Sequence, residues 1–442
     1  MKKLISTIKN IFAIEDLRVR ILNTLGFIAI FRLGSFVVLP GIDPSKLESS
    51  AQGILGLLDT FLGGAFGNAS IFALGIMPYI SASIVLQLLT IAVPYFQKLQ
   101  KEGESGRKKI NQYTRVLTIA ITLAQSVAFI ATINAEAINP AVNNTLFTIS
   151  SMIILTAGTM FCMWLGEKIT DKGIGNGISM LIMIGIVSRL PGALIGEALA
   201  LGLGRALIFI IELIVLFFVV MSVVMLTQAI RRIPVQYAKQ VGGSASLEAG
   251  QRQFIPLKVN AAGVMPIIFA QSLMFLPAMV ASFWQNDSEL ASEIGSVFSD
   301  YTSWQYNLSF AVLIIVFTFF YTAISVNPNQ ISDDLKRSGG FVPGVKPGLA
   351  TSEFIDEVLT RITLPGAIFL AIIAILPSIA MLFGVTREFA AFFGGTSLII
   401  LVGVVLDTLN QIESYLLMKH YDGMMKSGKL RGRSTSNVAV AS

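Results

Sequence analysis

Long apolar stretches dominate the chain and alternate with short polar segments. A helix needs about 20 mostly apolar residues to cross the hydrocarbon core of a bilayer. Ten stretches fit, at residues 21–39, 70–93, 115–134, 146–166, 176–195, 206–229, 260–284, 308–326, 364–384 and 395–417. The pattern therefore predicts an all-α membrane protein with ten transmembrane helices and with both termini on the same side.

The composition supports a membrane protein. Of the 442 residues, 54% are hydrophobic and 13% are charged, whereas soluble domains carry about 25% charged residues. These values exclude a soluble enzyme, a disordered chain and a nucleic-acid-binding domain as the main interpretation.

The positive charges are distributed unevenly between the two sides of the predicted spans. Of the 32 Lys and Arg residues, 27 lie in segments on the side of the termini. Lys46, Arg189, Arg205 and Arg387 are assigned to the other side, and Arg32 falls inside the first span. Cytoplasmic loops carry the excess of Lys and Arg in membrane proteins, so both termini are predicted to be cytoplasmic.

The spans divide into an N-terminal half, residues 1–200, and a C-terminal half, residues 201–418, followed by a cytoplasmic tail, residues 419–442. Five spans in each half give the halves opposite orientations, which permits an inverted repeat with function at their interface. Two cytoplasmic loops are long, at 231–259 and 327–363, yet each is far below the size of an ATP-binding domain. Because neither loop can hold an ATP-binding domain, we expect a docked partner or an ion gradient to supply the energy for any energy-consuming activity.

Residues 49–67, between the first two spans, are apolar but too short and too rich in glycine for a full span. The glycines are Gly53, Gly56, Gly63, Gly64 and Gly67. Irregular backbone at membrane depth survives only where protein or a water-filled cavity covers it. Two interpretations stay open: a re-entrant half-helix that lines a cavity, and an ordinary surface loop.

Arg32, Glu212 and Asp407 are charged residues that fall within predicted spans. Such residues normally face the protein interior or water. They fit either an ion or proton path or, as we favour, interior charges that hold helices together. A secondary transporter for a small solute is the alternative function, and it requires a compact polar site around Arg32 and Asp407.

Few catalytic side chains are available. Cys162 is the only cysteine and His420 the only histidine, which removes Ser-His-Asp triads within one chain, Cys-His dyads and His-pair zinc sites. An intramembrane aspartyl protease needs two facing carboxylates, and only Asp407 lies in the middle of a span. The sequence predicts neither an enzyme nor a bound cofactor or metal.

Six motifs carry a resemblance to a known family. They lie at residues 31–43, 69–83, 101–107, 173–179, 256–260 and 394–397. In this order, and over nearly the whole chain, they resemble the SecY family, whose members are central subunits of the bacterial protein-conducting channel.

The resemblance implies ten spans in two inverted halves around an hourglass pore. Secreted chains cross through this pore, and hydrophobic segments leave sideways through a lateral gate that recognises signal sequences. The gate lies between spans two and three on one side and spans seven and eight on the other. The implied location is the bacterial cytoplasmic membrane. The implied partners are SecE- and SecG-type small subunits, the motor ATPase SecA, the ribosome, preproteins with signal peptides, and membrane lipid.

The resemblance also implies roles for particular apolar residues. A pore ring of aliphatic side chains is expected at Ile76, Ile80, Ile182, Ile268 and Ile400. The segment 49–67 matches the family's plug, with the candidate residues Gly53, Leu57, Leu58, Phe61, Leu62, Gly63 and Gly64. Ile76 and Ile80 are four residues apart and are expected to share one helix face.

Gate and docking residues follow from the same resemblance. The lateral gate is expected at Ser81, Gln87, Gln125, Gln271, Ser272 and Leu276. SecA and the ribosome are expected to dock on Arg231, Arg232, Lys239, Arg252, Lys258, Lys336, Arg337, Lys346, Pro347 and Gly348.

Two departures from the family pattern concern docking. The family commonly has Arg-Pro-Gly where this chain has Lys346-Pro347-Gly348, and lysine lacks the bidentate fork of arginine. The tip of the first long loop, residues 242–250, is without Lys or Arg, whereas relatives are often basic there. Contact with a partner is therefore expected to shift toward the basic residues on either side of this tip.

Overall fold

The computed structural model of the chain describes residues 14–43, 46, 63–131, 133, 137–139, 143–202, 205–237, 253–271, 273–274, 297 and 302–426. In the N-terminal part the helices are α2 (Glu15–Gly34), α4 (Met77–Ala92), α5 (Pro94–Lys101), α6 (Glu104–Ala131), α7 (Asn144–Lys172) and α8 (Gly177–Leu201). In the C-terminal part they are α9 (Ala206–Gln228), α12 (Trp304–Ser325), α13 (Pro328–Arg337), α14 (Leu349–Leu382), α15 (Arg387–Ala390) and α16 (Gly395–Lys426).

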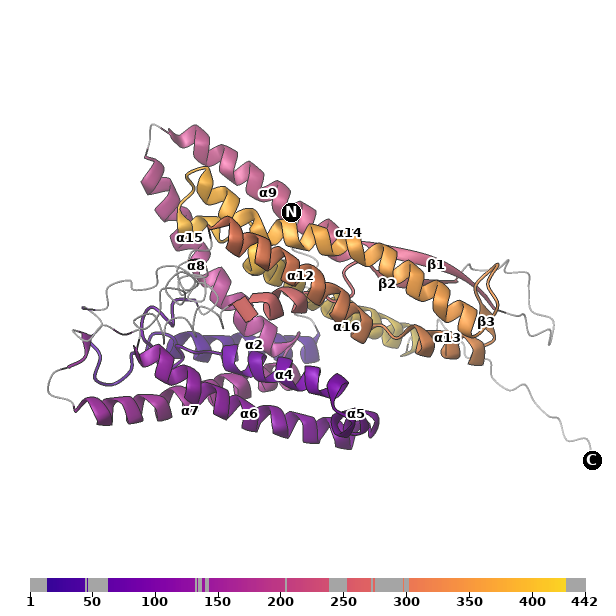
Figure 1. Cartoon of the computed structure of the whole chain (residues 1–442), viewed down its shortest axis with the longest axis horizontal. Coiled ribbons are helices and arrows are strands. Elements are labelled where there is room, and N and C mark those ends of the chain that lie inside the picture. Colours follow the sequence, from indigo (N-terminus) through magenta and orange to yellow (C-terminus); the bar gives the residue numbers. More distant parts are fainter. Residues whose placement is uncertain are drawn as a thin grey trace, which may run out of the picture.

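The helices form two groups that α8 joins. In Figure 1, α2, α4, α6 and α7 lie together in one group, and α9, α12, α14 and α16 lie together in the other. Helix α8 packs against α7 of the first group and against α16 of the second. The residues between the two groups are mainly apolar, including Ile76, Leu181 and Ile400, which belong to one buried cluster.

Seven of the described helices are long and apolar enough to cross a membrane, and the pair α4 and α5, bent by 97°, gives up to one more. Helix α2 covers most of the first predicted span, and part of the seventh span, 260–284, lies outside the described residues. The described part of the chain is consistent with the predicted all-α membrane fold.

Several helices extend beyond their predicted spans. Helix α14 has 34 residues, which corresponds to about 50 Å and exceeds the roughly 30 Å hydrocarbon core. Helices α6 and α7 also continue into polar sequence, α6 at its N-terminal end and α7 at its C-terminal end. Hydropathy locates only the apolar part of such a helix, because its polar turns have a low hydropathy.

The second span departs from its prediction at 70–93. Residues 70–76 form turns, and the regular helix begins at Met77, with Pro78 in its first turn. Instead of a helix, the chain forms backbone pairs with the segment that follows α2: the Leu39 N–H donates to the Ala69 carbonyl at 2.9 Å, and the Ile71 N–H to the Val37 carbonyl at 2.9 Å.

The described parts of the two long loops, residues 231–259 and 327–363, fold into one unit, which we call the loop unit. Strand β1 (Ile230–Tyr237) pairs antiparallel with β2 (Gln253–Lys258) on one edge and with β3 (Gly340–Phe341) on the other. The buried side chains of Ile233, Leu257, Val342, Ile355 and Leu359 form its small core. This sheet, whose strands come from both loops, was not predicted from the sequence.

Candidate functional site

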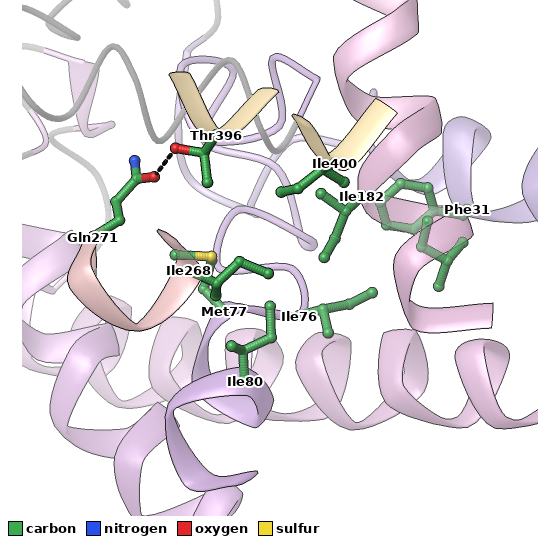
Figure 2. Close-up of a pocket in the computed structure, with 10 residues that line it drawn as sticks. Phe31, Ile76, Met77, Ile80, Ile182, Ile268, Gln271, Thr396 and Ile400 are labelled. Carbon is green, nitrogen blue, oxygen red and sulfur yellow. Dashed lines mark hydrogen bonds between the residues drawn. The ribbon is translucent and has the colours of Figure 1, made fainter. Parts of the chain in front are cut away.

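The five isoleucines of the predicted ring lie around one narrow pocket. Figure 2 shows Ile76, Ile80, Ile182, Ile268 and Ile400 converging on it. They come from four places: the start of α4, α8, the helical residues 265–271, and α16. Segments far apart in the sequence, from both parts of the chain, therefore supply one apolar constriction.

The first two isoleucines share the pocket although only one lies within a helix. Ile76 is the residue that precedes α4, and the Ile80 N–H donates to the Ile76 carbonyl at 3.1 Å. This bond closes the first turn and brings both side chains to the same side. Both are almost fully buried, at 3% and 8% exposure.

Five further residues line the pocket, and sequence reasoning gave a role to only one of them. They are Phe31, Met77, Leu181, Gln271 and Thr396. Gln271, which is predicted to belong to the lateral gate, also lines this pocket and accepts a hydrogen bond from the Thr396 hydroxyl (Figure 2). Thr396 belongs to the 394–397 motif, and Phe31 begins the 31–43 motif. Their place in these motifs is the sequence feature that could have identified them as pocket residues.

The other described gate candidates lie on neighbouring helices. Ser81 and Gln87 are on α4, and Gln125 is on α6, which packs against α4. The Ser81 hydroxyl donates to the Met77 carbonyl at 3.2 Å, and the Gln87 amide to the Ser83 hydroxyl at 3.3 Å. Ser272 and Leu276 lie outside the described residues.

Of the plug candidates, only Gly63 and Gly64 fall within the described residues. Both have positive φ values, 63° and 91°, which glycine adopts without strain. The plug candidates outside the described part of the chain are Gly53, Leu57, Leu58, Phe61 and Leu62.

The charges predicted within spans have different surroundings. Arg32 donates from Nη1 to the Gly63 carbonyl at 2.6 Å. Glu212 is largely buried on α9, whereas Asp407 is exposed on the surface of α16. An exposed Asp407 does not fit the compact polar site that a transporter requires, and no group of three potential metal ligands occurs among the described residues.

Most of the docking candidates lie on the loop unit. Arg231 and Arg232 are exposed on β1, and Lys258 is exposed on the neighbouring β2. Lys336 and Arg337 end α13 and are also exposed. These five residues place positive charge on one small folded unit, whereas Lys239 and Arg252 lie outside the described residues.

The Lys346-Pro347-Gly348 turn belongs to the same unit and is held by side-chain hydrogen bonds. Gly348 has a φ of 104° directly before α14. Its carbonyl accepts from the Ser332 hydroxyl of α13 at 2.6 Å, and the Lys346 carbonyl accepts from the Thr351 hydroxyl at 2.9 Å. The turn therefore presents Lys346 and Pro347, both exposed, from a fixed backbone.

The fold and the site define a polytopic membrane protein whose two groups of helices meet at an apolar constriction. The SecY family model matches residues 70–409. A relative from Streptomyces scabiei, "Protein translocase subunit SecY", is 44% identical over 433 residues, covering 94% of this chain and 98% of the relative. The chain belongs to the SecY family.

Solved structures share its fold. "The structure of a protein conducting channel" superposes with a TM-score of 0.62 at 16% identity and covers 95% of each chain. A second structure, "The plug domain of the SecY protein stablizes the closed state of the translocation channel and maintains a membrane seal", gives 0.61 at 17% identity and again covers 95% of each chain.

Proposed function

We propose that this chain is the central pore subunit of a Sec protein translocase. It conducts unfolded preproteins across the bacterial cytoplasmic membrane and releases hydrophobic segments sideways into the lipid. The observation that carries the proposal is the convergence of Ile76, Ile80, Ile182, Ile268 and Ile400 on one pocket between the two groups of helices.

An apolar constriction suits this role for two physical reasons. A narrow ring of aliphatic side chains loses its water and then blocks ions. The same ring offers no charged or strongly hydrogen-bonding partner, so chains of any sequence pass without being retained. The Thr396–Gln271 pair supplies polar side chains to the wall, and the Thr396 hydroxyl donates to the Gln271 side-chain oxygen.

The halves, the plug and the lateral gate are assigned as parts of the proposal. The halves are residues 1–200 and 201–418, and the segment 49–67 is the plug that seals the resting pore on its outer side. Ser81, Gln87 and Gln125, on the packed helices α4 and α6, belong to one side of the gate. Gln271, Ser272 and Leu276 are assigned to the opposite side by the resemblance alone.

The chain is proposed to act without catalysis, with its partners supplying the work. The loop unit, with Arg231, Arg232, Lys258, Lys336 and Arg337 exposed, is the proposed docking surface for SecA and the ribosome. Its positive charge attracts acidic protein surfaces and RNA phosphates. SecE- and SecG-type subunits complete the complex, and both termini lie in the cytoplasm.

Reconstitution tests this function. The chain is purified with its SecE-type partner and placed in liposomes, and SecA, ATP and a preprotein are added. The expected result is protection of the preprotein from external protease that depends on both SecA and ATP. Absence of protection, while a known SecA-dependent channel is active in parallel, would contradict the proposal.

A further inference from the structure

Arg32 makes a contact that links the first helix to the glycine turn beside the pore. Its Nη1 donates to the Gly63 carbonyl at 2.6 Å, and its guanidinium lies 4.7 Å from the centre of the Phe36 ring. The preceding residue, Phe31, lines the pocket (Figure 2). One turn of α2 therefore touches both the constriction and the Gly63–Gly64 turn.

The turn fits closely against α8. A Cβ atom at Gly63 would lie 2.9 Å from the Cα and the carbonyl oxygen of Gly185, both backbone atoms of that helix. A Cβ atom at Gly64 would lie 3.0 Å from the Arg189 guanidinium. Two arginines, one from α2 and one from α8, thus flank the same two glycines.

The chain that follows the turn is fixed as it approaches the ring. The Ser70 N–H donates to the Ala65 carbonyl at 3.0 Å, and the backbone pairs around Leu39 hold residues 69–71. Phe72 stacks on Phe31, with ring centroids 5.9 Å apart. A shift of the Gly63–Gly64 turn would therefore also shift Ile76, because these contacts hold the segment between them.

We propose that Arg32 is a positioning residue, which anchors the Gly63–Gly64 turn against α8 and thereby stabilises the closed state of the resting channel. The inference rests on the proposed function, because the turn directly follows the segment assigned there as the plug. Arg32 touches no translocating chain in this scheme and acts only through the turn.

The chemistry of the contact suits an anchor that must release. A charged donor forms a stronger hydrogen bond to a carbonyl than a neutral one, especially away from bulk water. Arg189 of α8 places a second positive charge beside the same turn. The aliphatic stem and the Phe36 ring hold the guanidinium in position, which lysine or glutamine cannot reproduce.

The test measures the ion leak of the full complex in liposomes without SecA or preprotein. Arg32→Gln is expected to raise the resting leak about tenfold, because a hydrogen bond to a charged group shifts a two-state equilibrium by that order. It is also expected to allow export of preproteins with defective signal sequences. Arg32→Lys is expected to fall between Arg32→Gln and the wild type.

The matched control is Arg20→Gln. Arg20 lies on the same helix and also donates to a backbone carbonyl, that of Gly173 at 3.2 Å, but at the cytoplasmic end. This variant is expected to leave both readouts unchanged. Transport of intact preproteins and the thermal midpoint of the complex are expected to stay near wild type in Arg32→Gln, which a general loss of structure would not allow.

A second variant tests the other partner of the contact. Gly63→Ala is expected to raise the leak as Arg32→Gln does, and the double variant is expected to leak no more than either single one. Gly202→Ala is its control, because Gly202 has a similar φ of 67° with no atom within 4 Å of the added Cβ. If the Arg32→Gln complex does not assemble, the anchor is tested by comparing the ion leak of Gly63→Ala with that of Gly202→Ala.

The two proposals fail in different ways. A wild-type complex that transports no preprotein overturns the proposed function. A wild-type complex that transports, together with Arg32→Gln and Gly63→Ala complexes that leak no more than it does, overturns the anchor alone.

Discussion

Glu197 of α8 accepts two hydrogen bonds from Thr386, which precedes α15, and so joins the two parts of the chain at the end opposite the loop unit. The Thr386 N–H donates to Glu197 Oε2 at 2.9 Å, and the Thr386 hydroxyl donates to the same oxygen. The Glu197 side chain is fully buried. This contact fixes the start of α15, whose Phe389 is also fully buried.

Loss of this contact is expected to destabilise the protein. Glu197→Ala leaves the Thr386 N–H without its acceptor and is predicted to lower the free energy of unfolding by about 2 kcal/mol. The thermal midpoint of the purified complex measures the effect. Thr386→Val tests the same contact from the other side, and strictly additive effects of the two changes would contradict a direct interaction.

The apolar character of the ring is predicted to control leak and selectivity. Ile76→Asn and Ile400→Asn place an amide in the constriction, which favours water there. The resting ion leak is expected to rise about tenfold, the change that corresponds to ~1.4 kcal/mol, and export of preproteins with defective signals is expected to increase. Ile76→Leu keeps the volume and the apolar surface and serves as the control. A leak unchanged by both asparagine variants would contradict the assignment of the ring.

Helix α7 packs closely against the turn before α4, and this contact is predicted to require a glycine at position 158. A Cβ at Gly158 would lie 2.1 Å from the Ile71 carbonyl oxygen, a backbone atom that cannot move aside cheaply. Gly158→Ala is therefore expected to destabilise the protein by about 1–3 kcal/mol. Gly192→Ala on α8 adds a Cβ with no atom within 4 Å and is expected to be neutral or slightly stabilising. Equal thermal midpoints for the two variants would argue against the packing.

Lys346 is predicted to contribute to the function of the motor. Lys346→Ala removes an exposed charge from a backbone that the Ser332 and Thr351 hydroxyls hold in place. The rate of SecA-driven transport is expected to fall severalfold, whereas Lys346→Arg is expected to match or exceed the wild type, because its fork restores bidentate contact. Lys98→Ala, at an exposed lysine of α5, is the control. If neither change at Lys346 altered the rate of SecA-driven transport, the prediction that SecA contacts Lys346 would be contradicted.

The sequence predicted the helical membrane fold well because apolar length is a local property. It also grouped Ile76, Ile80, Ile182, Ile268 and Ile400, but only through the family resemblance. Periodicity alone does not bring residues from four separate segments together, since an isoleucine that faces lipid and one that lines a pocket look the same in sequence.

Other features depend on contacts between distant segments and were not predictable. The partner of Arg32 is a backbone carbonyl, which carries no sequence signal. The turns at 70–76 replace a helix because the backbone pairs with residues 37–39. The sheet of β1, β2 and β3 joins two loops about 100 residues apart, and Thr396 pairs with Gln271 across two helices.

The central claim is that translocating chains pass through the isoleucine constriction, and site-specific crosslinking tests it most directly. Cys162 is the only cysteine, so a Cys162→Ala background allows single cysteines to be placed at Ile182 or Ile400, with Ile208 as a control exposed on α9. A preprotein arrested during SecA-driven transport is predicted to crosslink to the cysteine at either ring position and not to the one at Ile208. Efficient transport with no crosslink at either ring position, or an equal crosslink at Ile208, would contradict the account.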